Sequence, residues 1–510
     1  MTVPKKISTM HCTTRVRHPA WSNFILLAAC FVFGAPLAAR AAAPDFVLAK
    51  DGRAQAVIVP YGGDTNGLAF AANELAEFLG RLSGAAFMVA EKPVPGYKTL
   101  LVGAPYQPSE EQELRVRVKD ASTLEVTGDG PLGALYAAYD LLETLGCVFV
   151  SHDYTYAPTT NLLAVAGDYA KGDAPWMKLR NIWTELESHV PYMMRLRLQG
   201  ASGDPVWNKF GGKRVYAINH SIGGIWFRDR ELRKQHPEWF AYLRKGDRRS
   251  FGWVCVSNEE MYQQLFKEIA AYLGKHPGIP EVSVAIGDCS DFCECDKCLA
   301  EVEKYRDVGG EDVFSCQYLI LANRVAKHFA RDYPGVRFNI LAYGERQPSG
   351  NNITMEPNVG AFVAELWRNH GLPADCNPRG AYCMQHIAAI SPKSNPPYVW
   401  EYQANFRDFL IPFPNLKIFA QSARYYKRLG VRAIMAQNQY AKIGDLSEMK
   451  LWRYAKLTWN PDADQETLID TYLKAASAAT ASATRRSQPT RPPPPPSRLT
   501  TPLSASALHR

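Results

Sequence analysis

The chain has 510 residues, of which 46% are hydrophobic, 21% charged and 11% aromatic. This length exceeds what one ordinary hydrophobic core organises and predicts two or three domains. The net charge of +8 comes from the chain ends, because residues 1–41 and 475–510 each carry +5 and no acidic residue. The body between them has a net charge of −2, which gives no support to nucleic-acid binding.

The first 41 residues have the pattern of a secretory signal peptide. Basic residues precede an apolar stretch, Phe24–Ala38, and Ala39-Arg-Ala41 fits an A-x-A cleavage site. We therefore expect an exported protein, periplasmic or extracellular. The apolar stretch is short for a transmembrane helix, and no later segment predicts a stable membrane span. Leu27-Ala-Ala-Cys30 leaves a lipoprotein anchored through Cys30 as the minor alternative.

Residues 45–165 predict a small α/β domain. Short apolar runs alternate with two helices, Thr65–Leu82 and Pro131–Leu145, whose apolar residues recur at helical spacing. Gly128-Asp-Gly-Pro-Leu-Gly133, between a strand and the second helix, matches a dinucleotide-binding fingerprint. We expect the preceding strand to be antiparallel to its neighbour and half-exposed. The glycines are therefore interpreted as turn residues, and no cofactor is predicted.

Residues 176–473 predict a (β/α)₈ TIM-like barrel, with a doubly wound sheet as the alternative. Eight apolar strands recur along this segment: Leu179–Trp183, Val215–Ile218, Gly252–Val256, Val282–Ile286, Val336–Tyr343, Val359–Leu366, Tyr398–Tyr402 and Val431–Gln437. The clearest helices between them are Glu231–Leu243, Asn258–Leu273, Glu311–Asp332, Leu416–Leu429 and Glu448–Thr458.

The segment 475–510 is rich in Ala, Ser, Thr, Arg and Pro, and this low-complexity composition predicts a disordered tail. The abrupt change after Lys474 also indicates a frameshifted reading frame, with the genuine downstream sequence missing.

Acidic residues follow several predicted barrel strands, where active sites of this architecture form. Asp288 follows the fourth strand, Glu365 ends the sixth and Glu401 lies in the seventh. Glycoside hydrolysis uses one carboxyl group as acid and a second as nucleophile or base. We predict Asp288 as acid or acetamide-orienting group and Glu401 as nucleophile or base, with Glu365 as the competitor. A structural ion pair is the alternative role for each.

Other polar and aromatic residues at the same strand ends are candidates for sugar binding. Aromatic faces stack on the apolar faces of pyranose rings, and His and Asn side chains hydrogen-bond to hydroxyl groups. The predicted substrate-binding residues are His220, Tyr343, Trp367, Trp400, Tyr402 and Asn438.

Four cysteines are closely spaced just after Asp288: Cys289, Cys293, Cys295 and Cys298. Export favours disulfides within this loop. A tetrahedral zinc site is the alternative, and it would be structural because four thiolates leave no open coordination position. No catalytic metal is predicted. Cys147 and Cys255 are interpreted as buried strand residues.

Several stretches resemble known bacterial families. The first domain resembles the N-terminal domain of α-glucuronidases of glycoside hydrolase family 67 and the domain that precedes the barrel of β-hexosaminidases, through residues 71–76, 130–139 and 145–147. The remainder resembles the domain of unknown function 4838. The stretches that carry this second resemblance are His236-Pro-Glu-Trp-Phe240, the run from Asp288 to Cys298, Leu341-Ala-Tyr343, Trp400-Glu-Tyr402 and Pro412-Phe-Pro-Asn-Leu416.

The resemblance implies an exported glycoside hydrolase that cleaves a complex oligosaccharide or polysaccharide. One implied option is a retaining, acetamide-assisted endo-β-N-acetylglucosaminidase-like enzyme, and another is an α-glucuronidase acting on xylan side chains. A non-catalytic sugar-binding barrel is the alternative outside enzymes. Glu401 stands where the family more often has Asp, which is a departure from its pattern.

Overall fold

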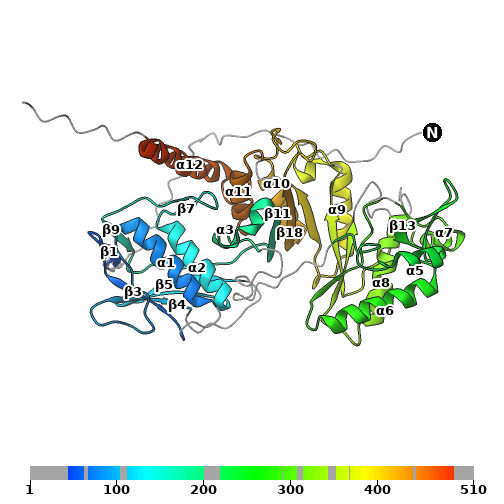
Figure 1. Cartoon of the computed structure of the whole chain (residues 1–510), viewed down its shortest axis with the longest axis horizontal. Helices are drawn as coiled ribbons and strands as arrows, with labels where there is room; N and C mark the ends of the chain where they lie inside the picture. Colours follow the sequence, from blue (N-terminus) through cyan, green and yellow to red (C-terminus); the bar gives the residue numbers. More distant parts are fainter. Residues whose placement is uncertain are drawn as a thin grey trace, which may run out of the picture.

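The computed structural model describes residues 44–62, 67–103, 112–199, 219–289, 291–306, 314–342, 352–366, 368–439 and 444–487. Figure 1 shows three parts along its long axis: an N-terminal unit in blue and cyan, a central sheet, and a green segment at the opposite end. The predicted signal peptide and the second predicted barrel strand lie outside the described residues. Within those residues, no helix combines the length and apolar character needed to cross a membrane.

The N-terminal unit is an α/β layer, as predicted. Among the described residues its larger sheet has the order β10-β5-β6-β4-β3, and two helices pack on it. Their apolar stripes are buried, which is why amphipathic sequences form these helices here. The elements are β3 (Ala56–Pro60), α1 (Leu68–Ser83), β4 (Lys98–Val102), β5 (Leu114–Asp120), β6 (Thr123–Gly128), α2 (Gly130–Thr144) and β10 (Ala170–Asp173). A smaller sheet joins β1 (Phe46–Lys50), β2 (Arg53–Ala54) and β9 (Leu162–Val165).

The glycine-rich turn between β6 and α2 is filled by the chain itself. β6 is antiparallel to β5, as expected, but it is also parallel to β4, central and buried, so the expectation of a half-exposed strand was wrong. A side chain on Gly128 or on Gly133 would collide with the backbone carbonyl of Glu113. Asp129 N–H donates to that same carbonyl at 2.8 Å. Close backbone packing therefore requires these glycines.

The central sheet is a curled half-barrel of parallel strands. Among the described residues six strands join it in the order β11-β18-β17-β16-β15-β14, and each neighbouring pair is parallel. A complete (β/α)₈ barrel is not confirmed. The strands are β11 (Leu179–Thr184), β14 (Glu281–Ser283), β15 (Arg337–Ala342), β16 (Val359–Ala364), β17 (Tyr398–Tyr402) and β18 (Ala433–Gln439). The helices after β14 to β18 include α8 (Gln317–Phe329), α9 (Pro378–Ile390), α10 (Phe419–Arg428) and α11 (Ser447–Trp459).

The prediction that Gly252–Val256 forms the third barrel strand was wrong. These residues belong largely to β13 (Arg248–Val254), which pairs antiparallel with β12 (Phe240–Leu243) in a separate hairpin. Gly246 and Asp247 have positive φ angles of 86° and 44°, the backbone of a tight hairpin turn. The predicted helix Glu231–Leu243 accordingly stops early: α5 spans Arg230–Gln235, and Pro237 follows it in a short 3₁₀ turn.

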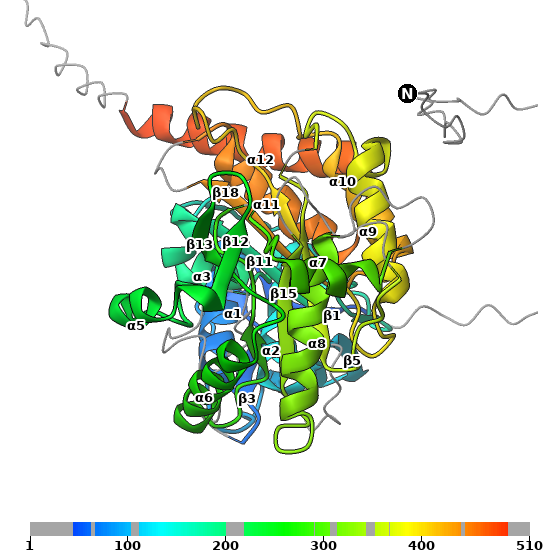
Figure 2. The same ribbon diagram turned by 90° about the vertical axis from the view of Figure 1, so that its right-hand side faces the viewer.

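The hairpin belongs to the green segment, which Figure 2 views from its own side. This segment also contains α6 (Glu259–Lys275), as predicted, and α7 (Asp296–Glu303). The loop after β14, which leads into α7, lies beside the hairpin, as two backbone hydrogen bonds show. Glu294 N–H donates to Tyr242 O at 2.7 Å, and Gly287 N–H donates to Gly252 O at 2.8 Å.

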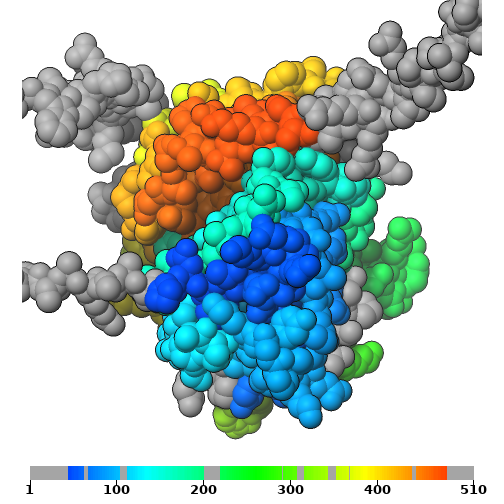
Figure 3. Space-filling model, turned by 90° about the vertical axis from the view of Figure 1, so that its left-hand side faces the viewer, coloured from blue at the N-terminus to red at the C-terminus, as the bar shows by residue number. Residues whose placement is uncertain are grey.

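The final helix closes the chain back onto the N-terminal unit. α12 spans Gln465–Ser487, so the predicted disorder from residue 475 was wrong up to residue 487. Tyr472 and Ala475 are buried, and the Tyr472 hydroxyl donates to Val150 O at 3.1 Å. Alanine favours helix, and tertiary contacts anchor the start of α12. Figure 3 shows α12 in orange-red beside the blue and cyan N-terminal unit.

Buried charges also join the N-terminal unit to the half-barrel. Arg195 makes two hydrogen bonds to Glu74, at 2.8 and 2.9 Å. Glu143 of α2 accepts from Arg197 at 2.8 Å and from Lys456 of α11, and these two cations lower its pKa against the effect of burial. These ion pairs form part of the interface between the two predicted domains.

Candidate active site

The half-barrel sheet has two faces with different chemistry. Alternate residues of five strands, together with Ala285 just after β14, form a small apolar cluster whose described members include no helix residue: Leu179, Ala285, Leu341, Phe362, Ala364, Tyr398, Trp400, Tyr402, Ala433 and Met435. The residues between them, such as Val399 and Ile434, belong to the large core that includes the helices. We call the first the inner face and the second the outer face. Successive side chains of a strand point to opposite faces, so neighbours in sequence are separated by the sheet.

The inner face carries an aromatic and amide group near the carboxyl ends of three strands. Trp183 of β11 packs edge-to-face on Trp400 of β17, with ring centroids 5.1 Å apart. Trp400 Nε1 donates to Gln437 Oε1 of β18 at 3.2 Å. Trp400 is buried, whereas Trp183 and Gln437 are partly exposed. Trp400 therefore supports two side chains that remain open to a ligand.

Glu401 points to the outer face, where both of its oxygens are engaged. Oε1 accepts from Arg368 Nη2, and Oε2 accepts from the Tyr426 hydroxyl of α10 at 2.7 Å. The Glu401 and Arg368 side chains are only 2% and 4% exposed. Burial and the Glu401 carboxylate together raise the pKa of Tyr426 well above its usual value. This arrangement is an internal ion pair, the alternative role considered for strand-end carboxylates.

Glu365 joins the same buried group from the end of β16. Its Oε2 lies 3.5 Å from Arg368 Nε, and neither of its oxygens has a hydrogen-bond partner among the described residues. Burial raises the Glu365 pKa to about 7, opposed by Arg368 and reinforced by Glu401. His370 lies 3.9 Å from Glu401, and burial lowers its pKa to about 4. Two of the three predicted catalytic carboxyls are therefore brought together, with one arginine between them.

Asp288 lies apart from that group, exposed in the loop after β14. His220 is at the same place, because its Nδ1 lies 3.0 Å from Ile286 O. The next residues hold that segment against the strand, since Ile222 N–H donates to Ala285 O at 3.0 Å. The sequence prediction that His220 and Asp288 share one end of the sheet agrees with this geometry. Their roles stay predictions.

The other predicted sugar-binding residues have different positions. Tyr402 is buried on the inner face, and its ring lies edge-on to His370, with centroids 5.5 Å apart. Asn438 is buried at a register shift between β11 and β18, where it has no partner residue in the ladder. Such bulges redirect side chains. Tyr343 and Trp367 lie outside the described residues.

The cysteine group differs by one member from the sequence prediction. Cys293, Cys295 and Cys298 converge with Cys255, which follows β13, and not with Cys289. Cys289 instead packs on Gly252, where a side chain would collide with its sulfur. Cys255, Cys293, Cys295 and Cys298 are all free thiols in the structure, so they form no disulfide there. The interpretation of Cys255 as merely a buried strand residue was incomplete.

Sequence reasoning missed Arg368, Tyr426 and Trp183. Trp183 ends the first predicted strand, so the strand-end rule used for the carboxylates would have found it. Arg368 is three residues after Glu365, a spacing that is common among surface pairs and carries little signal. Tyr426 lies on a helix remote in sequence, and no local pattern connects it to Glu401.

Comparison with known proteins gives a family and a fold. The family model described as "Domain of unknown function (DUF4838)" matches residues 149–488. No curated protein matches the chain. A solved family GH115 4-O-methyl-α-glucuronidase with specificity for decorated arabinogalactans aligns at 12% identity and a TM-score of 0.52, over 84% of this chain and 59% of that enzyme. The GH20 β-N-acetylhexosaminidase from Streptomyces coelicolor A3(2) aligns at 10% identity and a TM-score of 0.48, over 86% and 95%. The chain has a glycosidase-like fold.

Proposed function

We infer that this chain, which belongs to the DUF4838 family, is an exported glycoside hydrolase that cleaves a bond in a complex glycan. The observation that carries the proposal is the composition of one end of the half-barrel. Trp183 and Gln437 stay partly exposed there over the buried Trp400. An exposed carboxylate, Asp288, follows β14, the strand at the opposite edge of the same parallel sheet, at its carboxyl end. Aromatic, amide and carboxylate groups together suit the binding and protonation of a sugar.

The positions of the three carboxyl groups favour unequal roles. We assign to Asp288 the role of acid or acetamide-orienting group, because it is the one of the three that solvent reaches. The sequence predicted Glu401 as the candidate nucleophile. Its ion pair with Arg368 instead favours a role in which Glu401 holds the end of β17 in position. Substrate-assisted glycosidases use the acetamide group of the sugar and need no protein nucleophile. An endo-β-N-acetylglucosaminidase-like activity therefore agrees with Asp288 being the exposed member of the three predicted carboxyl groups.

α-Glucuronidase activity is the second candidate. It is favoured by the similarity of fold to the GH115 4-O-methyl-α-glucuronidase, together with the resemblance of the N-terminal unit to the corresponding domain of family 67 α-glucuronidases. The substrate would then carry uronic acid side chains, as in glucuronoxylan or a decorated arabinogalactan.

Sugar release separates these activities. Purified protein is incubated with N-glycans, glucuronoxylan and arabinogalactan, and the released products are identified by mass. Asp288→Asn should lower turnover of the active substrate by about 10²–10⁴-fold, the usual contribution of an acid or base. Asp470→Asn, at an exposed position of α12, is the matched control and should leave turnover unchanged.

Three results would count against the assignment. Full activity of Asp288→Asn removes that residue from the chemistry. Glycan binding without any product from the wild-type chain favours a sugar-binding protein. A mature chain that retains residues 1–41 in the cell's soluble interior contradicts export, because cleavage at the predicted site leaves Ala42 as the first residue.

A further inference from the structure

We propose that Cys255, Cys293, Cys295 and Cys298 bind one Zn²⁺ ion as a structural site, on the basis of the convergence of their four sulfur atoms. The four Sγ atoms all lie within 4.8 Å of one another. The proposed zinc site has a structural role and takes no part in the glycan chemistry. The proposal therefore does not depend on whether the chain is a hydrolase.

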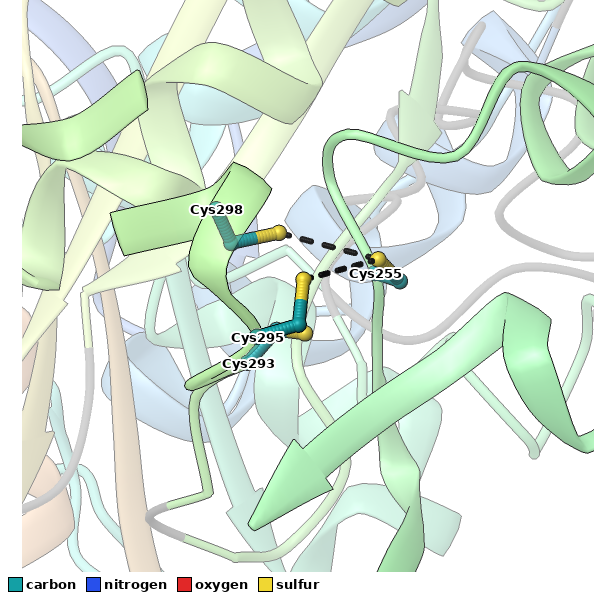
Figure 4. A group of neighbouring side chains, drawn as sticks. All are labelled: Cys255, Cys293, Cys295 and Cys298. Carbon is teal, nitrogen blue, oxygen red and sulfur yellow. Dashed lines mark hydrogen bonds between the residues drawn. The ribbon is translucent and has the colours of Figure 1, made fainter. Parts of the chain in front are cut away.

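The sulfur separations match metal coordination and not disulfides. Cys255 Sγ lies 3.6 Å from Cys298 Sγ and 3.7 Å from Cys295 Sγ. A disulfide would bring two sulfurs to about 2.05 Å. Four sulfurs at about 2.3 Å from a central zinc are about 3.8 Å from one another, which is the edge of the tetrahedron. Figure 4 shows the Cys255 sulfur facing those of Cys295 and Cys298, with Cys293 beside Cys295.

The ligands come from two segments that the fold holds together. Cys255 follows β13, whereas the other three lie in the loop after β14 and at the start of α7. Gln317 fixes the position of Cys293: its Nε2 donates to Cys293 O at 2.9 Å, and its Oε1 accepts from Cys293 N–H at 3.2 Å. Cys295 and Cys298 have the C-x₂-C spacing that is common among the ligands of structural zinc sites.

The surroundings suit bound thiolates. Cys293 and Cys298 are fully buried, and Cys255 is 6% exposed. Tyr242 N–H donates to Cys293 Sγ at 3.4 Å, and the Ser257 hydroxyl lies 3.2 Å from Cys298 Sγ. A donated hydrogen such as that of Tyr242 N–H compensates part of the excess negative charge of four thiolates around one divalent cation. Four thiolates complete the tetrahedron, so the ion has no open position for catalysis.

The role that follows is to join the β12–β13 hairpin to the loop that begins with Asp288. Two further contacts run in parallel: Ser250 donates to Asp291 at 2.5 Å, and Arg244 pairs with the exposed Asp296 at 2.6 Å. The Arg244–Asp296 pair is exposed and contributes little on its own. The Ser250 hydrogen bond is partly buried and contributes more. A metal ion would be the strongest of the links between hairpin and loop.

The test measures metal, not sugar release. The full chain, purified without chelator, is analysed by inductively coupled plasma mass spectrometry and should contain one zinc per chain. Titration of the thiols with a mercurial reagent should release that zinc in step with four sulfurs. Co²⁺ in place of Zn²⁺ should give the visible bands of tetrahedral cobalt–thiolate coordination.

Two cysteine variants make the assignment specific. Cys255→Ser should lose most of the zinc and lower the melting midpoint by roughly 5–10 °C. Cys289→Ser is the matched control from the same loop and should keep the zinc, because Cys289 lies outside the group. Should Cys255→Ser fail to fold, the mercurial titration and the cobalt spectrum of the wild-type chain still decide the question. Disulfides among the four thiols by peptide mapping, or equal loss of zinc from Cys289→Ser, would overturn the proposal.

Discussion

Trp400 and Glu401 are neighbours on β17, yet they lie in opposite surroundings. Trp400 belongs to the inner face, where it contacts Trp183 and Gln437. Glu401 belongs to the outer face, where Arg368 and Tyr426 hold its carboxylate beneath the helices. The two faces of one strand therefore separate a surface suited to ligands from a buried electrostatic support.

The contrast teaches that a carboxylate at a strand end is not enough to locate catalysis. Position along a strand decides which end of the barrel a residue occupies, but the pleat decides which face it reaches. Glu365 and Glu401 satisfy the first condition and lie on the helix side. Four substitutions can test whether the outer face supplies stability while the inner face supplies ligand contacts.

The largest effect should follow removal of the shared cation. Arg368→Met leaves Glu365 and Glu401 buried without a positive partner, and we expect the free energy of unfolding to fall by about 3–5 kcal/mol. Urea denaturation measures this change. Arg331→Met is the control, because the Arg331 side chain is 91% exposed beside Asp332 and such pairs contribute roughly 0–1 kcal/mol. Equal losses of unfolding free energy in the two variants would refute the role of Arg368 as the shared buried cation.

The next effect is a pH dependence that originates in Glu365. Its pKa is raised from 4.5 to about 7, so the folded state holds the proton more tightly than the unfolded state. Its contribution to stability is complete below pH 4.5 and is lost as the pH rises through 7. The stability of the wild type relative to Glu365→Gln should therefore fall by on the order of 3 kcal/mol over that range.

Comparison with Glu365→Gln is needed because His370 titrates nearby in the opposite sense. Its pKa is lowered to about 4, so its contribution is present above pH 6.5 and is lost as the pH falls through 4. Urea denaturation of both proteins at several pH values gives the difference curve. A flat difference between pH 4.5 and 7 would show that Glu365 does not have the raised pKa.

A smaller loss should result from Tyr426→Phe, which removes one hydrogen bond to the buried Glu401 carboxylate. Hydrogen bonds to charged groups contribute about 1.5–3 kcal/mol, and we expect a decrease in the free energy of unfolding in that range. Tyr242→Phe is the matched control, since the Tyr242 hydroxyl donates to Asp247 at an exposed site. If thermal or urea unfolding ranks the control as the more damaging change, the proposed importance of the buried network is wrong.

The smallest change in stability is expected on the inner face. Gln437→Leu removes the acceptor of the Trp400 indole and should cost about 1 kcal/mol. Its effect on kcat/KM toward an active glycan should be greater than this stability change explains. Unchanged kinetics would separate Gln437 from the ligand surface and would leave the inner face without its proposed role.

Sequence periodicity alone predicted much of the architecture. The helices α1, α2, α6, α8, α10 and α11 and the strands β11 and β14 to β18 agree with apolar spacing, because burial of one face imposes that spacing locally. The helices α7 and α9 were not predicted. The hairpin of β12 and β13 was not predicted, since a strand's partner is a long-range choice. The same apolar run fits a barrel strand or a hairpin strand until its neighbour is known.

The sequence by itself also determined the chemistry available: carboxylates near strand ends, tryptophans beside them and a closely spaced set of cysteines. Only the tertiary structure decided how these groups combine. It paired Glu401 with Arg368 and Tyr426, and it replaced Cys289 by Cys255 in the thiol group. The physical reason is the same in both cases. A site forms where separate segments converge in space, and the spacing of residues along the sequence does not indicate which distant residue completes it.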